Sequence, residues 1–299
     1  MFLAAGFFDG LHRGHQRVIA QTVARARAAG GEAWILTFDA HPLKILAPAA
    51  APRLLTSNRH KLKLIESLGV DGCLLLPFTR ALAGLEPALF VGRLRRQIPS
   101  LAEIFVGTNW RFGRHASGRP ALLARLGRDL DFAVTVVPPV FHQGHPVSSS
   151  RIRRHILLGQ FSQASALLGR PCSVLGTVIH GRGVGRKLGY PTANLDLHNE
   201  VLPPNGVYAV TARIHAGHRR AAIDAAGIAS LGVRPTFRNT PPGATVLEIH
   251  LLDMRPVLYG RDVEVFFRRK IRRERAFRSA EELRRQIPLD ILRARRILG

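Results

Sequence analysis

The sequence has little cysteine, few acidic residues and no long apolar run, and each shortage excludes a class of protein. Cys73 and Cys172 are the two cysteines in 299 residues, and no cluster of metal-binding side chains surrounds them, which argues against a disulfide framework or a zinc site. No apolar run approaches a membrane span, and the start lacks the basic and apolar regions of a signal peptide. We therefore expect a cytoplasmic protein without a membrane anchor.

The shortage of acidic residues leaves a strong positive charge. The chain has 20 acidic against 44 basic residues, for a net charge of +24. Both halves share the excess, so it does not form a detachable basic tail. Such a charge attracts small anionic substrates and nucleic acid alike, and by itself it does not choose between them. The length favours two domains, each able to bury its own core.

The most informative stretch is GFFDGLHRGHQ, residues 6–16. A short apolar strand precedes it, two glycines permit a tight turn, and a helix begins at about residue 14. The exposed N–H groups at that helix start favour an anion. His12 and His15 are three residues apart, so both imidazoles can face one atom and donate to charge on a transferring phosphate. An isolated pair with this spacing is more often a pair of surface histidines.

The first half alternates short apolar strands with amphipathic helices. This alternation predicts a doubly wound, mostly parallel sheet, in which ligands bind beyond the carboxyl ends of the strands. The expected strands cover residues 3–5, 33–38, 72–76, 103–106 and 132–137, and the expected helices cover residues 14–28, 59–68 and 86–97.

Two polar motifs directly follow strands of this half. TFDAHP places His41 after the second expected strand, where it would lie beside the first two histidines. VGTNWRFG places Asn109 and Arg111 at the same edge. The Asn109 amide suits a phosphate or a ribose, while Trp110 and Phe112 fit a core and a base-stacking surface equally well.

A third motif, VSSSRIRRHI, opens a helix near the end of the first half. Residues 148–150 are serines that can cap the helix, and its start again favours anions. Arg153 or Arg151 could neutralise a leaving pyrophosphate through charge-assisted hydrogen bonds. Taken alone, the segment fits a capped basic helix equally well.

These motifs together resemble a known family. HRGH preceded by GFFDG is similar to the H-x-G-H pattern of nucleotidyltransferases, in the form found in the adenylyltransferase half of the bacterial bifunctional riboflavin kinase/FMN adenylyltransferase (FAD synthetase) family. The resemblance implies a Rossmann-like nucleotidyltransferase domain in which ATP is bound and its phosphates are polarised. Ser150 stands where the family usually has Thr. The family also usually has a longer lead-in, so either the start is truncated or that sheet edge is less covered. The implied ATP contacts are Gly6, Phe8, His12, His15, Asn109, Ser149 and Arg153, of which His12, His15 and Arg153 are catalytic.

The pattern changes after a short helix at residues 161–168 and a stop at Gly169. Strands bounded by glycine and proline then predict a closed antiparallel barrel, followed by two helices. We therefore expect an α/β domain at residues 1–169 and a β-barrel domain at residues 170–299. The expected barrel strands are 173–179, 206–214, 221–229, 246–252 and 262–271, and the expected helices are 280–286 and 288–298.

The loop HGRGVGRKLGYPTAN, residues 180–194, is rich in glycine and basic residues. Backbone N–H groups with Arg182, Arg186 and Lys187 could cover phosphates, although simple mobility explains such a loop equally well. It lacks Walker A spacing. Thr192 and Asn194 lie on one side of an extended segment, so both oxygens can reach one Mg²⁺ ion.

The strand VLEIHLLD carries the candidate catalytic residue of the second half, Glu248. Glu248 and His250 share one face, and the leucines and isoleucine between them take the other. A carboxylate pointing to the barrel mouth can accept the proton of an alcohol that attacks a γ-phosphate. A solvated strand residue is the alternative.

The second half resembles the riboflavin kinase module of the same family from end to end. The resemblance implies that Thr192 and Asn194 hold Mg-ATP, that Gly181, Gly185 and Lys187 contact ATP, and that Glu248 activates the ribityl 5′-hydroxyl. The matching segments are GTVIHGRGVGRKLGYPTANLDL, GVYAV, GVRPTF, LEIHLLD, LYGRDVEV and IRRERAFRSAEELRRQIPLD.

The two modules imply an enzyme that converts riboflavin to FMN and then FMN to FAD, with ATP and Mg²⁺, small-molecule substrates and no nucleic acid or membrane partner. One alternative is an H-x-G-H adenylyltransferase for another phosphorylated substrate, with a barrel that only binds. Another is a nucleic-acid-binding protein, whose affinity would fall steeply with salt.

Overall fold

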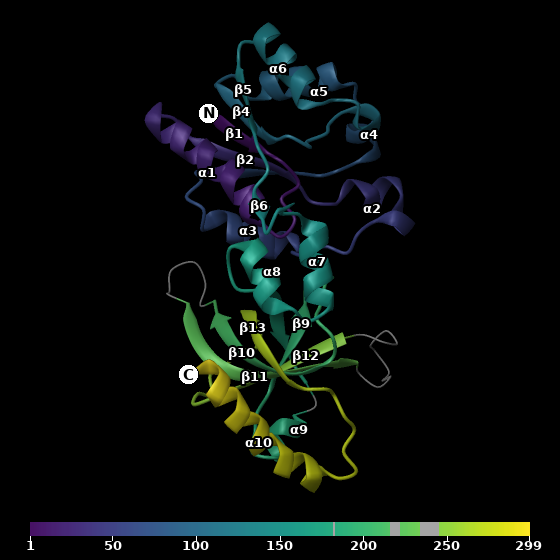
Figure 1. The fold of residues 1–299 in the computed structure, drawn as a ribbon, viewed down its shortest axis with the longest axis vertical. Helices are drawn as coiled ribbons and strands as arrows, with labels where there is room; N and C mark the ends of the chain where they lie inside the picture. Colours follow the sequence, from purple (N-terminus) through teal and green to yellow (C-terminus); the bar gives the residue numbers. More distant parts are fainter. Residues whose placement is uncertain (182, 216–221, 234–244) are drawn as a thin grey trace. The chain divides into compact units, whose positions relative to one another are not determined.

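The computed structural model describes residues 1–181, 183–215, 222–233 and 245–299. Its internal contacts divide the chain into two compact units, Met1–Ser149 and Ser150–Gly299. Figure 1 shows a sheet flanked by helices in the first unit and a barrel with a long C-terminal helix in the second. Within the described residues, no helix is long and apolar enough to cross a lipid bilayer.

The first unit is built on a parallel sheet of five strands in the order β3-β2-β1-β4-β5. The central strand β1 pairs with β2 through Ala4 and Ile35 and with β4 through Ala4 and Phe105. The chain passes from β1 to β2 and β3 on one side and then crosses to β4 and β5 on the other side. The loops after β1 and β4 therefore border a switch point, where ligands bind in such sheets. The strands are β1 (Phe2–Ala5), β2 (Ala33–Phe38), β3 (Gly72–Leu76), β4 (Glu103–Gly107) and β5 (Ala133–Val137).

Helices cover both faces of this sheet because alternate side chains of each strand point to opposite sides. Ala4 and Ile35 belong to a core that Val18 of α1 and Ile65 of α3 complete. Leu3 belongs to a second core, together with residues of α5 and α6. The helices are α1 (Arg13–Ala28), α2 (Pro42–Leu46), α3 (Asn58–Glu66), α4 (Arg80–Ala83), α5 (Pro87–Gln97) and α6 (Pro120–Asp129); a small hairpin, β6 (Phe141–His142) and β7 (His145–Pro146), follows.

The second unit is a closed barrel in the order β10-β11-β12-β9-β8-β13. Helix α8 packs on it through Phe161, whose ring stacks on Phe267 at 5.4 Å. The elements are α7 (Ser149–Leu157), α8 (Phe161–Leu168), β8 (Ser173–Ile179), α9 (Val184–Lys187), β9 (Ala193–Leu197), β10 (Gly206–Ile214), β11 (Ile223–Val233), β12 (Thr245–Leu251), β13 (Asp262–Arg272) and α10 (Ala280–Leu298).

The fold confirms the predicted doubly wound domain followed by a barrel. The short helices α2, α4 and α9 and the β6–β7 hairpin were not predicted, and larger differences concern α6, β9 and the C-terminal helix. The prediction omitted α6 and treated β9 as loop, because β9 follows directly on the glycine-rich segment. It also expected two terminal helices, but α10 runs unbroken through Pro288. Side chains on both sides of that proline, Ile287 and Ile291, pack on the barrel in one cluster, and this burial offsets the hydrogen bond that proline cannot make.

Candidate active sites

The turn after β1 has a backbone conformation that few side chains adopt. Phe8 and Leu11 have positive φ angles of 55° and 40°. A Cβ at Gly6 would lie 2.8 Å from the Phe8 ring, so the ring can occupy its place only beside a glycine. The Thr37 hydroxyl donates to the Phe7 carbonyl at 3.0 Å and ties the turn to the end of β2.

Asp9 anchors the same turn to distant parts of the first unit. Its side chain is buried, and Oδ1 accepts from the backbone N–H groups of Leu55 at 2.9 Å and Thr56 at 3.2 Å. The Ser149 hydroxyl donates to the Asp9 carbonyl at 3.0 Å. The aspartate of the F-D-G motif therefore shapes the turn, and its backbone holds Ser149 beside it.

The two histidines of the motif lie against each other. His12 caps helix α1, its Nδ1 accepts from the His15 backbone N–H, and the two rings stack at 3.6 Å between centroids. Burial is the main cause that lowers the pKa of His15, and electrostatic interactions with His12 and Lys61 lower it further. His15 is therefore neutral at pH 7. Its Nδ1 is buried and has no hydrogen-bond partner among the described residues.

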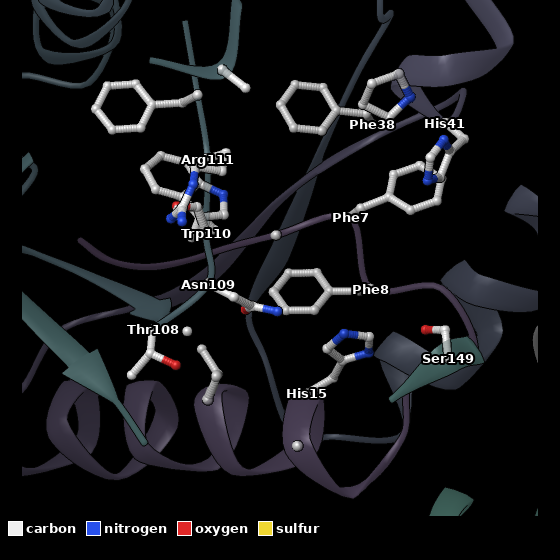
Figure 2. A pocket seen from close by; sticks show the side chains of 18 of the residues that line it. Phe7, Phe8, His15, Phe38, His41, Thr108, Asn109, Trp110, Arg111 and Ser149 are labelled. Atoms are coloured by element: carbon white, nitrogen blue, oxygen red, sulfur yellow. The ribbon is translucent and has the colours of Figure 1, made fainter. Parts of the chain in front are cut away.

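A cavity of about 1160 Å³ opens over this turn. It is lined by six of the residues predicted to contact ATP, namely Gly6, Phe8, His12, His15, Asn109 and Ser149. Figure 2 shows the Phe8 ring between His15, which comes from α1, and Asn109, which comes from the loop after β4. The Phe8 and His15 rings meet edge to face at 5.3 Å. The strand ends thus bring together groups that the sequence separates widely.

His41 and Arg111 line the same cavity, as predicted from their positions after strands. The His41 ring packs edge to face on Phe7 at 5.0 Å (Figure 2). The seventh residue predicted to contact ATP in this half, Arg153, is absent from the lining. It lies on α7 in the second unit, and Nη1 is 3.4 Å from the Ser150 hydroxyl.

The sequence analysis missed part of the aromatic wall of this cavity. Phe38 and Phe78 meet edge to face at 5.6 Å, and Trp110 stacks on Phe112 at 4.6 Å. All four line the cavity, and Phe112 is also buried in the core, so its expected core role is confirmed, while base stacking stays a prediction. Phe38 ends strand β2, and this position is the signal that could have identified it.

In the second unit, strand pairing places Glu248 directly opposite Asn194 on β9 and opposite Ser230 on β11. Directly opposed residues of antiparallel strands share a face, so the three side chains form a row across the wall. Leu247 and Leu195 are buried on the other face. Glu248 therefore lies on the outer face of the barrel wall, which corrects the expectation that it points to the barrel mouth; the interior is filled by the leucines.

The glycine-rich loop passes close to this row. A Cβ at Gly181 would lie 2.6 Å from Cγ of the buried Asn194, and one at Gly185 would lie 3.1 Å from the Thr192 hydroxyl oxygen. Lys187 is exposed on α9. Arg182, predicted to contact phosphate, lies outside the described residues. The loop and the strands β9 and β12 together thus bring four of the predicted kinase residues into one region: Gly181, Gly185, Thr192 and Asn194.

A second cavity, of about 380 Å³, lies beside Thr192. Arg186 and Tyr259 also line it, whereas Glu248 and Asn194 do not. The His180 ring stacks on Tyr259 at 4.0 Å between centroids. The cavity has a flat aromatic side, a guanidinium and a hydroxyl, which suit a base, a phosphate and a metal-bound oxygen respectively.

Comparisons with known proteins match the two halves of the chain to two family models. The family model for FAD synthetase matches residues 1–151, and the model for riboflavin kinase matches residues 168–298. The bifunctional riboflavin kinase/FMN adenylyltransferase of Escherichia coli K12 is 35% identical over 297 residues, which cover 99% of this chain and 92% of that one.

This chain belongs to the bifunctional riboflavin kinase/FMN adenylyltransferase family.

Another member of this bifunctional family, from Bacillus subtilis, is 32% identical over 292 residues, covering 96% of this chain and 89% of that one. A crystal structure described as a macrolide-efflux protein from Streptococcus pneumoniae is 28% identical, with a TM-score of 0.80 over 98% of this chain and 93% of that one. The family and the fold predicted from the sequence are thereby confirmed.

In the barrel unit of this chain, the oxygen atoms around β9 fit a Mg²⁺ ion. Thr192, just before β9, and Asn194 on β9 offer a hydroxyl and an amide oxygen, and Mg²⁺ prefers oxygen ligands. The Glu248 carboxylate on β12 lies opposite Asn194. Among the described residues, no group of three or more His, Cys, Asp or Glu side chains could hold a metal ion.

Proposed function

We infer that this chain makes FAD from riboflavin in two steps. It transfers a phosphate from ATP to riboflavin, giving FMN and ADP, and then an adenylyl group from a second ATP to FMN, giving FAD and pyrophosphate. The observation that carries this inference is the tandem match of two family models, each to a region with its own cavity. We assign the adenylyl step to residues 1–169 and the kinase step to residues 170–299.

The adenylyl step fits the larger cavity. Its volume of about 1160 Å³ exceeds that of an ordinary single-ligand pocket, which suits two substrates held side by side. Gly6, Phe8 and Ser149 would contact ATP beside the start of α1, where backbone N–H groups favour phosphate. His12, His15 and Asn109 would donate to the α-phosphate oxygens as charge builds there.

The bonds exchanged in this step involve no covalent protein intermediate. An FMN phosphate oxygen attacks the α-phosphorus of ATP, and the bond from that phosphorus to the bridging oxygen breaks and releases pyrophosphate. We propose that Arg153 stabilises the charge of the leaving pyrophosphate through its guanidinium.

The kinase step fits the row of side chains on β9 and β12. Glu248 would accept the proton of the ribityl 5′-hydroxyl as that oxygen attacks the γ-phosphorus of ATP and ADP leaves. Thr192 and Asn194 would hold Mg²⁺, and Gly181, Gly185 and Lys187 would contact the phosphates. Bound Mg²⁺ supplies charge neutralisation on the phosphate oxygens. Small-molecule substrates and a need for ATP support a cytoplasmic enzyme without nucleic acid or membrane partners.

Product analysis by chromatography tests these assignments. The parent protein with Mg²⁺, ATP and riboflavin should give FMN and then FAD. Glu248→Gln should lower FMN formation at least about 100-fold and still make FAD from added FMN. His15→Ala should accumulate FMN, because the kinase step is spared. His145→Ala, an exposed histidine outside the cavity lining, is the control.

Two outcomes would reject the proposal. Absence of FMN when the folded parent is given riboflavin would leave an adenylyltransferase for another substrate. Loss of both activities in a folded Glu248→Gln or His15→Ala variant would show that the steps are not divided between the two regions.

A further inference from the structure

Lys61 is a buried cation that neither proposed step uses. It lies on helix α3, only 2% of its surface is exposed, and it does not line the cavity. Its Nζ donates to the Phe38 carbonyl at 2.7 Å and lies 3.5 Å from the Phe7 carbonyl and 3.4 Å from the Thr37 hydroxyl. These oxygens lie at and just beyond the carboxyl ends of β1 and β2, so Lys61 joins the two strand ends.

The contacts of Lys61 extend toward the nucleotide cavity. Its Nζ sits 4.8 Å from the centre of the Phe7 ring. The next residue is Phe8, whose strained backbone presents its ring to His15 at 5.3 Å. A displacement of the Phe7 carbonyl would therefore move Phe8 and the ring that packs on His15.

The position of this cation is costly, which argues against a purely structural role. Burial lowers the pKa of Lys61 to about 8, although Asp9, Cys73 and Asp39 favour its charged form. An apolar side chain of similar length would fill the same space without this cost, since buried charges are weak contributors to stability. At neutral pH the ammonium remains charged, and its field acts on His15, together with that of His12.

We propose that Lys61 is a positioning residue for adenylyl transfer, which holds the Phe7–Phe8 turn, and with it the Phe8 ring beside His15, in place. This rests on the proposed assignment of that step to the larger cavity. Burial is the main cause that keeps the His15 ring neutral, and the charge of Lys61 adds to it. A neutral imidazole can donate one hydrogen bond to the phosphate in the transition state. An imidazolium would instead form a tight ion pair with the triphosphate in the ground state. Such a pair would lower KM without raising kcat, and a neutral ring avoids it.

Lys61→Met tests the proposal in the full chain, with Lys63→Met on the same helix as the matched control. Lys61→Met should lower kcat for FAD formation from FMN by about 10-fold to 100-fold, because small displacements of catalytic groups cost this much. The KM for ATP should not rise. FMN formation from riboflavin measures folding of the other unit in the same sample. Lys61→Gln, which keeps an N–H donor but no charge, replaces the methionine variant if that one fails to fold.

The second readout is the titration of His15 by NMR, with its signal assigned by its loss in His15→Gln. The His15 pKa should rise in Lys61→Met and in Lys61→Gln, because both remove the nearby charge, and it should stay unchanged in Lys63→Met. An unchanged His15 titration, or an unchanged kcat, in a folded Lys61 variant would overturn the proposal. If His15→Ala itself retains full FAD formation, the fault lies instead with the assignment of the adenylyl step.

Discussion

Burial lowers the pKa of two basic side chains near the nucleotide turn, His15 and Lys61. Both would gain hydration if they moved to the surface, and both are retained where an anionic substrate is expected. Surface charge alone would not set such a site apart, because the chain as a whole has a net charge of +24. Specific positions inside the fold, rather than net charge, therefore distinguish the nucleotide site.

The lowered pKa of Lys61 makes the stability of the protein depend on pH. The group has a pKa of about 8 in the folded protein and 10.5 when unfolded, so the unfolded chain binds the extra proton between these values. Stability due to Lys61 should therefore rise as the pH goes from 8 to 10.5, by about 3 kcal/mol at most. Urea unfolding of the parent and of Lys61→Met across this pH range measures the contribution of Lys61. The contributions of the other titratable groups cancel in the difference between the two free energies of unfolding. A difference that does not vary with pH would contradict the lowered pKa.

Gly181 gives a sharper test at the barrel site than a charged residue would. Gly181→Ala places a Cβ 2.6 Å from Cγ of the buried Asn194 and must displace that amide or the loop. We expect the rate of FMN formation to fall by about 10-fold or more, since the displaced amide is a proposed Mg²⁺ ligand. The KM for Mg²⁺ should rise, while FAD formation from FMN should not change.

Gly92→Ala is the control for this substitution. Gly92 lies on α5, and a Cβ there would meet no atom within 4 Å. Both activities should remain at the level of the parent. A Gly181→Ala protein with unchanged kinetics would show that Asn194 has room to move and does not need its present position.

At the scale of elements, the C-terminal helix is held by an ion pair as well as by apolar packing. Asp290 is buried at 2% exposure, and Arg272 Nε lies 2.9 Å from its Oδ2. The Gln286 amide donates to the same carboxylate at 2.8 Å. This pairing lies two residues beyond Pro288, so it supports the helix where the backbone lacks a donor.

Removing the arginine should therefore destabilise the second unit. Arg272→Met leaves Asp290 buried without its charge partner and should cost about 3 kcal/mol in the free energy of unfolding. Arg285→Met removes an exposed pair with Glu281 and should cost no more than about 0.5 kcal/mol. Thermal denaturation, followed by circular dichroism, compares the melting temperatures of the two variants with that of the parent. Equal melting temperatures would mean that the buried pair contributes nothing.

Element boundaries were predictable where hydrophobic patterns were clear. Strands at 33–38, 72–76 and 173–179 agree with the structure to the residue, because apolar runs bounded by turn residues leave little choice. Strand β9 was missed because its pairing with β8 and β12, not its own pattern, makes it a strand. Pro288 was misleading because tertiary packing of α10 overrides its local effect.

At the scale of the whole molecule, the two proposed activities need not be coupled. If FMN leaves the kinase site before adenylylation, a mixture of folded His15→Ala and Glu248→Gln should convert riboflavin to FAD, although neither variant does so alone. Chromatography of the mixture after a time course measures this. Absence of FAD from the mixture, while the Glu248→Gln protein still uses added FMN, would mean that FMN is not released between the steps.

The sequence by itself determined the family and the order of its two modules, and it predicted six residues that line the larger cavity. Short motifs such as H-x-G-H carry this information because the chemistry of phosphate binding requires particular side chains and glycines at short, local spacings. These requirements are met within a few residues of the chain.

Only the tertiary structure decided which distant groups meet. The parallel strands bring Asn109 and Ser149 to the turn of His12 and His15, and the barrel register sets Glu248 against Asn194 on its outer wall. Lys61 carries no motif, and its contacts with Phe7 and Phe38 arise from the packing of α3 against two strand ends. Such contacts depend on the pairing and packing of elements far apart in sequence, which no local spacing encodes.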